Sequence, residues 1–213
     1  MTLISTAALF LYGLASSLHS YYADNFERVR ALSKPLLMPL LGLFYYLALG
    51  DSQWIYGALL FAWLGDIALL KHAKAFFMLG LVGFLVGHLC MSTHLIGLLS
   101  TSLTGATSVA IFMVMLVLAL GIFNYLRPHL GALKLPVLVY CLVLATKGSL
   151  ALILVWQMPS VPTALVAAGA LVFMVSDLTL AINRFVKPIH KVHLWVMSSY
   201  TLAQAMMVLG LSQ

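Results

Sequence analysis

The chain has 213 residues, of which 63% are hydrophobic and only 8% are charged, and its mean hydropathy is +1.09. A soluble domain carries roughly 25% charged residues, so this composition excludes an ordinary soluble domain and indicates a protein that crosses a membrane several times. The net charge of +6 does not indicate a nucleic-acid partner, because the basic residues are confined to short segments between apolar runs. Cys90 and Cys141 lie inside apolar runs, where cysteine behaves as a small hydrophobic residue.

Eight apolar runs follow one another along the chain, each near the ~20 residues that a helix needs to cross a bilayer. Their approximate windows are 3–20, 34–49, 53–70, 75–98, 106–125, 136–157, 162–182 and 192–211. The continuity of the runs favours helices over barrel strands. We therefore predict an all-α, polytopic bundle of eight transmembrane helices that forms a single domain over residues 1–213.

Two local features of these runs give further expectations. The first run has no basic flank before it and no small-residue cleavage site after it, so we expect a mature helix and not a signal peptide. Proline is tolerated in the first turn of a helix, and four prolines are expected in opening turns: Pro35, Pro39, Pro136 and Pro162.

The Lys and Arg residues predict the orientation of the bundle. They follow the first, third, fifth and seventh runs, whereas the segments after the second, fourth and sixth runs contain none, and Lys147 inside the sixth run is the one exception. The positive-inside rule makes the basic segments cytoplasmic. We therefore expect a multi-pass protein of the bacterial inner membrane, with both termini on the non-cytoplasmic side.

Two aspartates lie inside apolar runs, where a charged side chain is costly and marks a functional site. Asp66 belongs to the run Phe61–Leu70 and Asp177 to Phe173–Ala181, and the other three acidic residues are expected in loops. At 1.5 Å per residue, both aspartates lie roughly 7–11 Å inside the predicted cytoplasmic boundary. Because the third and seventh runs point in the same direction, the two side chains can converge in one cavity. The similarity of the two segments also suggests a four-plus-four parallel repeat.

For the remaining polar residues inside the runs, the sequence allows either a structural or a functional role. His88 is either a packed histidine bonded to a neighbouring helix or a ligand contact. Lys34 either extends to the membrane surface or binds a phosphate group. Lys147 must pair, lose its charge or face a wet cavity, and the sequence gives it no firm role. Four further residues either bridge helices or line the cavity: Tyr140, Ser176, Tyr200 and Gln204.

The order of several short motifs over nearly the whole chain resembles the YhhN family. In the first half these are Lys34-Pro35, Gly65-Asp66 with Leu69, and Phe77-x-x-Gly80-x-x-x-Phe84-x-x-x-His88. In the second half they are Tyr140, Gly169-Ala170-x-x-Phe173-x-x-Ser176-Asp177, Asn183-x-Phe185 and Tyr200-x-x-x-Gln204. Family members with an assigned activity are lysoplasmalogenases, which cleave the vinyl ether bond of a lysophospholipid to a fatty aldehyde and glycerophosphoethanolamine or glycerophosphocholine.

The resemblance implies that Asp66 and Asp177 are essential to this activity. We further expect that no cofactor is needed and that seven polar residues bind substrate: Lys34, His88, Tyr140, Ser176, Asn183, Tyr200 and Gln204. The chemistry agrees. Vinyl ether hydrolysis needs an acid to protonate carbon and a carboxylate to stabilise an oxocarbenium ion and orient water, as in glycosidases. A buried aspartate pair can supply both groups, and the sequence does not assign which aspartate has which role. Lys34, with Arg184 or Lys187, is expected to hold the phosphate.

Two alternatives stay open from the residues alone. A transporter or lipid-flipping protein would use the aspartates to relay protons or bind cations, and a parallel repeat favours that reading. A metal-dependent membrane hydrolase would use His88 together with the aspartates, although no spaced set of metal ligands is present in the sequence.

Overall fold

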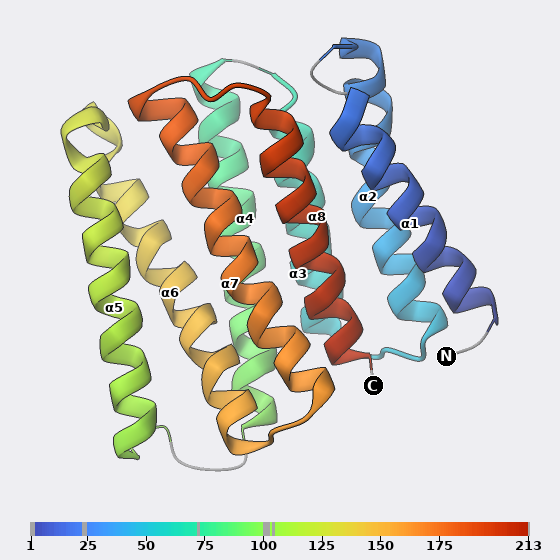
Figure 1. The fold of residues 1–213 in the computed structure, drawn as a ribbon, viewed down its shortest axis with the longest axis vertical. Helices are drawn as coiled ribbons and strands as arrows, with labels where there is room; N and C mark the ends of the chain where they lie inside the picture. The colour runs from blue at the N-terminus through green and yellow to red at the C-terminus, as the bar shows by residue number, and fades with distance from the viewer. Residues whose placement is uncertain (1–2, 23–24, 72, 100–102, 104, 213) are drawn as a thin grey trace.

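The computed structural model describes residues 3–22, 25–71, 73–99, 103 and 105–212. Within these residues the chain forms eight α-helices joined by short connections (Figure 1). Their bounds are α1 Leu3–Tyr22, α2 Glu27–Leu47, α3 Gln53–Ala68, α4 Lys74–Leu98, α5 Ala106–Leu126, α6 Lys134–Gln157, α7 Val161–Ala181 and α8 Val192–Leu211. Two 3₁₀ turns, Arg127–His129 and Gly131–Leu133, separate α5 from α6, and a five-residue π-helix, Ile182–Val186, extends α7. The predicted all-α bundle is confirmed.

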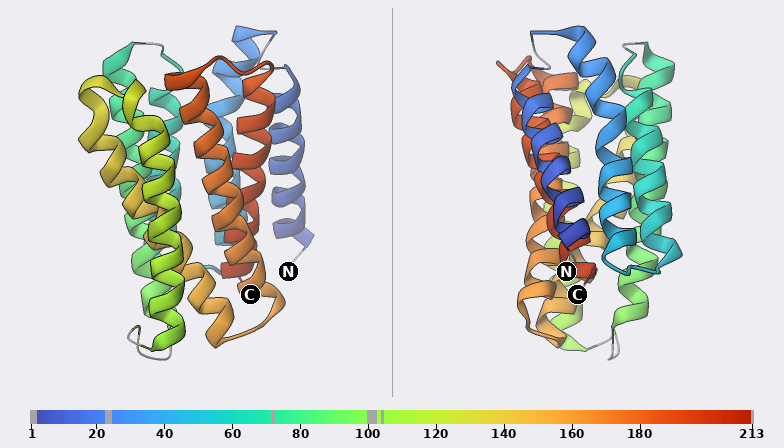
Figure 2. Two further views of the ribbon diagram at one scale, coloured as in Figure 1. Left: turned by 60° about the vertical axis from the view of Figure 1, so that its left-hand side comes forward. Right: turned by 90° about the vertical axis from the view of Figure 1, so that its right-hand side faces the viewer.

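Seven of the helices pack in a closed ring, in the order α1, α2, α3, α4, α6, α7, α8 and back to α1. Helix α5 lies outside this ring and packs mainly on α6, at the left of Figure 1. The side views in Figure 2 show that all the helices run nearly parallel to one long axis. The interior of the ring is therefore a narrow space that side chains from several helices share.

Six of the eight helices are long and apolar enough to cross a membrane, so the chain is a multi-pass integral membrane protein. The other two are α2 and α3. Helix α2 carries four charged residues in its first half, and α3 has 16 residues. The expected count of eight membrane crossings thus remains a prediction.

Helix α2 begins earlier than predicted, and three expectations about this region are wrong. Glu27 starts α2, so an acidic residue other than the two aspartates is helical. Pro35 and Pro39 lie in the interior of α2 and not in its opening turn. We predicted a loop for the charged segment before Lys34. Its Glu and Arg residues have a high helix propensity, and they extend the helix beyond its apolar part.

A tryptophan from the neighbouring helix allows α2 to contain Pro39. Proline has no N–H group, so it leaves unpaired the carbonyl of the residue four positions earlier, which here is Pro35. The Trp63 Nε1 group of α3 donates a hydrogen bond to this carbonyl at 2.8 Å. In a membrane, such side-chain donors replace the backbone bonds that proline removes. The same contact joins α2 to α3 next to the aspartate of α3.

The helix that carries each aspartate packs closely on the helix that follows it. A Cβ atom added to Gly83 of α4 would lie 3.0 Å from Gly65 N and Phe61 O of α3. A Cβ atom added to Gly169 of α7 would lie 2.8 Å from Ala203 O of α8. Glycine at these two positions lets the backbones of each pair approach each other. Sequential helices pack on each other within α1–α4 and within α5–α8, and the four-plus-four repeat remains a prediction.

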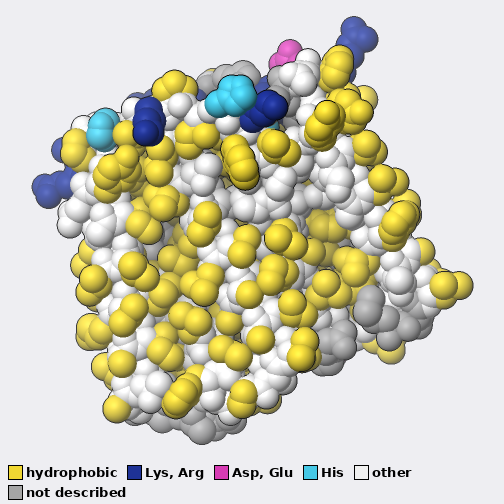
Figure 3. Space-filling model, in the orientation of Figure 1, with side chains coloured by type: hydrophobic (Ala, Val, Ile, Leu, Met, Phe, Trp, Pro, Cys, Tyr) yellow, Lys and Arg dark blue, Asp and Glu magenta, His cyan; other side chains and the backbone are white. Residues whose placement is uncertain are grey.

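The charged residues gather at one end of the bundle. In the space-filling view of Figure 3 the Lys and Arg side chains lie along the upper edge, and hydrophobic side chains cover the rest of this face. This edge contains the connections that follow α1, α3, α5 and α7, and we call it the basic end. The chain termini lie at the opposite end (Figure 1). The structure therefore agrees with the charge asymmetry of the sequence.

Candidate active site

A polar cavity of about 200 Å³ lies inside the basic end of the bundle. Both Asp66 and Asp177 line it, as expected for two side chains at the same depth. Its other polar and charged lining residues come from five different segments: His19, Arg30, Lys34, Lys71, Ser176, Asn183, Arg184, His193 and Tyr200. The cavity therefore holds two carboxyl groups among several cationic side chains.

Asp66 is held by one charged and one neutral partner. Its Oδ1 atom lies 3.3 Å from Lys34 Nζ of α2, and its Oδ2 atom accepts a hydrogen bond from the Tyr200 hydroxyl of α8 at 2.8 Å. Only 2% of the Asp66 side chain is exposed. Lys34 points inward to this carboxylate, so it does not extend to the membrane surface. Asp66 therefore has a buried ion pair and one additional hydrogen bond.

Among the described residues, Asp177 has one hydrogen-bond partner, a tyrosine, and a histidine lies nearby. Its Oδ2 atom accepts a hydrogen bond from the Tyr140 hydroxyl of α6 at 2.5 Å and lies 3.9 Å from His88 Nε2 of α4. Among the residues that the structure describes, no Lys or Arg lies within 4.0 Å of its carboxyl group. The side chain is 17% exposed, toward the cavity. The two aspartates thus face one cavity in different electrostatic surroundings.

The surroundings of the two aspartates correspond by position in the fold. Each aspartate contacts a side chain from the helix before it, Lys34 of α2 or Tyr140 of α6. Each also contacts the last helix of the other half, through Tyr200 of α8 or His88 of α4. No hydrogen bond joins the two carboxyl groups in the described part of the chain. They share the cavity, and each has its own set of partners.

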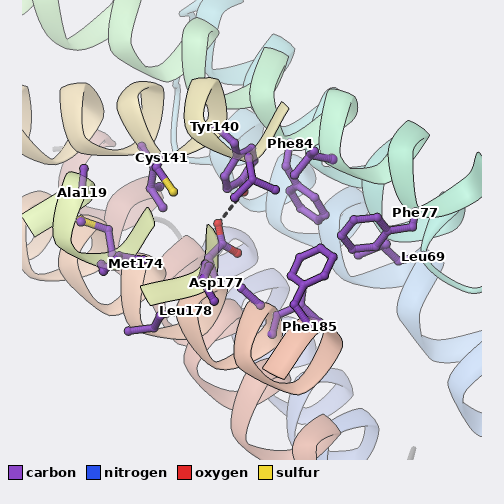
Figure 4. A pocket seen from close by; sticks show the side chains of 17 residues that line it. Leu69, Phe77, Phe84, Ala119, Tyr140, Cys141, Met174, Asp177, Leu178 and Phe185 are labelled. Atoms are coloured by element: carbon purple, nitrogen blue, oxygen red, sulfur yellow. Dashed lines mark hydrogen bonds between the residues drawn. The ribbon is translucent and has the colours of Figure 1, made fainter. Parts of the chain in front are cut away.

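A second cavity, of about 80 Å³ and almost entirely apolar, adjoins the first one (Figure 4). Side chains of α4, α5, α6 and α7 line it, among them Phe77, Ala119, Cys141 and Met174. Asp177 lines both cavities, and Figure 4 shows its carboxyl group pointing toward Tyr140 among the apolar side chains. The candidate site therefore has a polar part and an apolar part that meet at Asp177.

The other predicted site residues divide into three groups. Ser176 and Asn183 line the polar cavity, but each also has a structural bond: Ser176 donates to the Val196 carbonyl of α8, and the Asn183 side chain accepts from Ile189 N. Tyr140 lines the apolar cavity. His88 and Gln204 line a smaller third space together with Lys147, deeper in the bundle. Lys187 does not line either large cavity.

Four polar residues of this cavity were not predicted from the sequence as site residues: His19, Arg30, Lys71 and His193. Arg30 Nη1 lies 3.1 Å from His193 Nε2, which links α2 to α8 above Asp66. A helical reading of residues 27–34 would have found Arg30, because residues four apart share one helix face and Lys34 was already selected. Among the described residues, no group of three or more His, Cys, Asp or Glu side chains is placed to hold a metal ion.

Fold and site together define a multi-pass helical membrane protein with an acidic site inside the bundle, next to its basic end. The comparison with known families agrees. Residues 29–211 match the YhhN family, and the chain belongs to that family. No solved structure matches this chain.

Several relatives of the chain have a named activity. A lysoplasmalogenase of Mycobacterium bovis is 30% identical over 163 residues, which cover 75% of this chain and 60% of that protein. The lysoplasmalogenase of Mycobacterium tuberculosis gives the same values. Lysoplasmalogenase TMEM86A of Bos taurus is 28% identical over 214 residues, covering 97% of this chain and 85% of the relative. The chain thus spans less than two thirds of the length of the mycobacterial proteins.

Proposed function

We propose that the protein is a lysoplasmalogenase-like ether hydrolase, which cleaves the vinyl ether of a 1-alkenyl lysophospholipid to a fatty aldehyde and glycerophosphoethanolamine or glycerophosphocholine. The observation that carries this proposal is the meeting of a polar and an apolar cavity at Asp177. A lysoplasmalogen also has a polar part and an apolar part, because its vinyl ether lies between a charged headgroup and an apolar chain. The named activity of the relatives supports the same substrate class.

The substrate would lie across both cavities. Its chain would occupy the apolar cavity between α4, α5, α6 and α7, and its phosphate would lie in the polar cavity near Arg184, with Lys34 and Arg30 close by. Guanidinium groups bind phosphate oxygens with paired hydrogen bonds. His88, Ser176, Asn183, Tyr200 and Gln204 would shape the site and hold the two carboxyl groups. The vinyl ether would then lie beside Asp177.

The surroundings of the two aspartates assign their roles in this proposal. Asp177, which has no Lys or Arg partner in the described chain, would be the acid. It gives its proton to the β-carbon of the vinyl ether, which leaves an oxocarbenium ion on the adjoining carbon. Asp66, which is paired with Lys34, would act as the carboxylate that stabilises this cation and takes a proton from water as the water oxygen attacks. When the hemiacetal collapses, Asp177 recovers a proton from its hydroxyl group and Asp66 protonates the departing glycerol oxygen.

The experiment uses purified protein in detergent with a panel of lysolipids, and mass spectrometry to detect the products. We expect free aldehyde from 1-alkenyl lysolipids, and we expect Asp66→Asn or Asp177→Asn to abolish it without unfolding the protein. General acid–base groups contribute roughly 100- to 10,000-fold each. Asp51→Asn is a matched control, because Asp51 is an exposed aspartate in the α2–α3 connection. Full activity in either site variant, or release of fatty acid in place of aldehyde, would refute the proposal.

A transporter or lipid-flipping protein is the second candidate, and the predicted four-plus-four repeat favours it. Detergent solution separates the two candidates, because a hydrolase turns over substrate there and a transporter has no second compartment to fill. Loss of activity with a chelator and its recovery with Zn²⁺ would instead indicate a metal-dependent hydrolase.

We also propose that the protein lies in a bacterial inner membrane with its basic end in the cytoplasm and both termini outside. The concentration of Lys and Arg at one end of the bundle supports this orientation. Reporter fusions to the N-terminus and to the α3–α4 connection would test it, because only the second should be active in the cytoplasm.

A further inference from the structure

Lys147 is a buried lysine that the proposed reaction does not use. It lies near the middle of α6, and its side chain has no solvent exposure. No Asp or Glu of the described chain lies within 4.0 Å of its ammonium group. Its two contacts are the Phe173 ring, whose centroid is 3.9 Å from Nζ, and His88 Nδ1, which is 3.4 Å from Nζ. A buried lysine without an acidic partner is costly, so its contacts need a functional explanation.

These contacts continue as a chain of hydrogen bonds from Lys147 to Asp177. His88 Nδ1 faces Lys147, and His88 Nε2 lies 3.1 Å from the Tyr140 hydroxyl. The Tyr140 hydroxyl in turn donates to Asp177 Oδ2 at 2.5 Å. Lys147, His88 and Tyr140 are all buried. Three helices, α4, α6 and α7, are thereby joined, and Tyr140 and Asp177 at one end of this series line the apolar cavity.

The chemistry of the four groups determines which group donates and which group accepts in each of these hydrogen bonds. The ammonium form of Lys147 has donors only, so in that form His88 Nδ1 accepts from Lys147. A neutral imidazole with an accepting Nδ1 carries its hydrogen on Nε2, and it donates that hydrogen to Tyr140. The tyrosine hydroxyl has a single hydrogen, which is directed to Asp177 Oδ2. The Lys147 Nζ atom also lies over the Phe173 ring face, in the geometry of a cation–π contact.

We propose that Lys147 is a positioning residue, which acts through His88 and Tyr140 to determine the oxygen of Asp177 that carries the reactive proton. An Oδ2 atom that accepts from Tyr140 leaves Oδ1 to hold the proton. Without the ammonium group, His88 can change tautomer and Tyr140 can turn its hydrogen toward His88 Nε2. The Asp177 proton can then move to Oδ2 and face Tyr140. The catalytic consequence rests on the function proposed above, whereas the direction of the hydrogen bonds does not.

The first test is nitrogen NMR of the protein with ¹⁵N-labelled histidine, in detergent at neutral pH. His88→Gln identifies the signals of His88 by their loss. We expect His88 to have a bare Nδ1 and a protonated Nε2 in the wild-type protein, and a changed tautomer ratio in Lys147→Met. Ser149→Ala is the matched control, because Ser149 is a buried polar residue two positions away on α6 that bonds only the Ala145 carbonyl.

The second test is kinetic. We expect Lys147→Met to lower kcat by roughly 10- to 100-fold, the usual effect of removing a residue that orients a reacting group, with little change in KM. His88→Gln should retain more activity than His88→Leu, because the glutamine amide can accept from Lys147 and donate to Tyr140. A purely structural role would lower activity in parallel with thermal stability, and it would give glutamine no advantage.

Two results would overturn the proposal. One is a wild-type His88 with its hydrogen on Nδ1, and the other is a Lys147→Met protein with unchanged tautomer and unchanged kcat. If Lys147→Met does not fold, the wild-type spectrum and the two His88 variants decide the question. If the wild-type protein releases no aldehyde from any lysolipid, the proposed function fails. The NMR spectrum still shows which groups donate and which accept in the hydrogen bonds from Lys147 to Asp177.

Discussion

At the scale of single residues, the structure separates two aspartates that look alike in the sequence. Asp66 shares its buried position with the ammonium group of Lys34, whereas Asp177 accepts from a tyrosine and lies beside a histidine. A neighbouring cation stabilises a carboxylate, and a neutral hydrogen-bonded site can keep a carboxylic acid protonated. The different partners are therefore the physical basis for giving the two aspartates different roles.

The ion pair of Asp66 leads to a stability prediction. Lys34→Met should destabilise the protein by about 3–5 kcal/mol, because it leaves a buried carboxylate without its cation. The double variant Lys34→Met/Asp66→Asn should recover most of this loss, since no unpaired charge then remains. Thermal unfolding in detergent measures both effects. Equal destabilisation in the single and double variants would show that Lys34 contributes through packing and not through its charge.

At the scale of the helices, two contacts hold helices together around the site: one joins α2 to α3, and the other joins α7 to α8. Trp63 satisfies the carbonyl that Pro39 leaves unpaired in α2. Glycine at position 169 lets α7 and α8 approach until their backbones touch. Both contacts lie within a few turns of an aspartate, so they fix the helices that carry the site.

The tryptophan contact can be tested with a double-mutant cycle. Trp63→Phe should cost about 1–3 kcal/mol, because the Pro35 carbonyl is then buried without a donor. In a Pro39→Ala background the backbone N–H of residue 39 can donate a hydrogen bond to the Pro35 carbonyl. Trp63→Phe should therefore lower the free energy of unfolding by less in that background. The comparison of the two unfolding midpoints is the measurement. An equal cost in both backgrounds would mean that the indole ring matters for its packing alone.

The glycine contact gives a second prediction at this scale. Gly169→Ala should destabilise the bundle by about 1–3 kcal/mol, because the new Cβ atom meets the backbone of α8 and the helices must move apart. Gly121→Ala in α5 is the control, because a Cβ atom there meets nothing within 4 Å. Alanine also has the higher helix propensity, so the control should be neutral or stabilising. A neutral Gly169→Ala variant would contradict the close approach of α7 and α8.

At the scale of the whole molecule, the ring of seven helices and the outer helix α5 create the two cavities. The polar cavity lies inside the ring at its basic end, and the apolar cavity lies beside α5, which packs on α6, and is lined by side chains of α4, α5, α6 and α7. An interior of this kind gives an amphipathic ligand one surface for its charge and another for its chain. The arrangement of helices, and not any single motif, accounts for the proposed substrate class.

The apolar cavity can be filled without touching the carboxyl groups. Ala119→Phe places a large side chain where we expect the lipid chain, so it should raise KM strongly for long-chain lysolipids and weakly for short-chain ones. Val117→Phe is a matched control, because Val117 lies on the same helix and is 69% exposed on the outer surface. Kinetics with a series of chain lengths measure the effect. If KM rose by the same factor for every chain length, the lipid chain would not bind in the apolar cavity.

By itself, the sequence determined the class of the protein, the order and approximate bounds of its helices, and the two aspartates that line the polar cavity. The reason is that the bilayer demands long apolar runs, and a carboxyl group inside such a run is conspicuous. The start of α2 was missed because its charged first turns lack the apolar signal, although they have good helix propensity.

Only the tertiary structure decided which side chains meet each aspartate. The pairing of Lys34 with Asp66, and the line from Lys147 through His88 and Tyr140 to Asp177, join residues from helices that are distant in the chain. Such contacts depend on the rotation and spacing of packed helices, which glycines and a proline set locally. A single sequence does not record these quantities, because many packings bury the same apolar faces equally well.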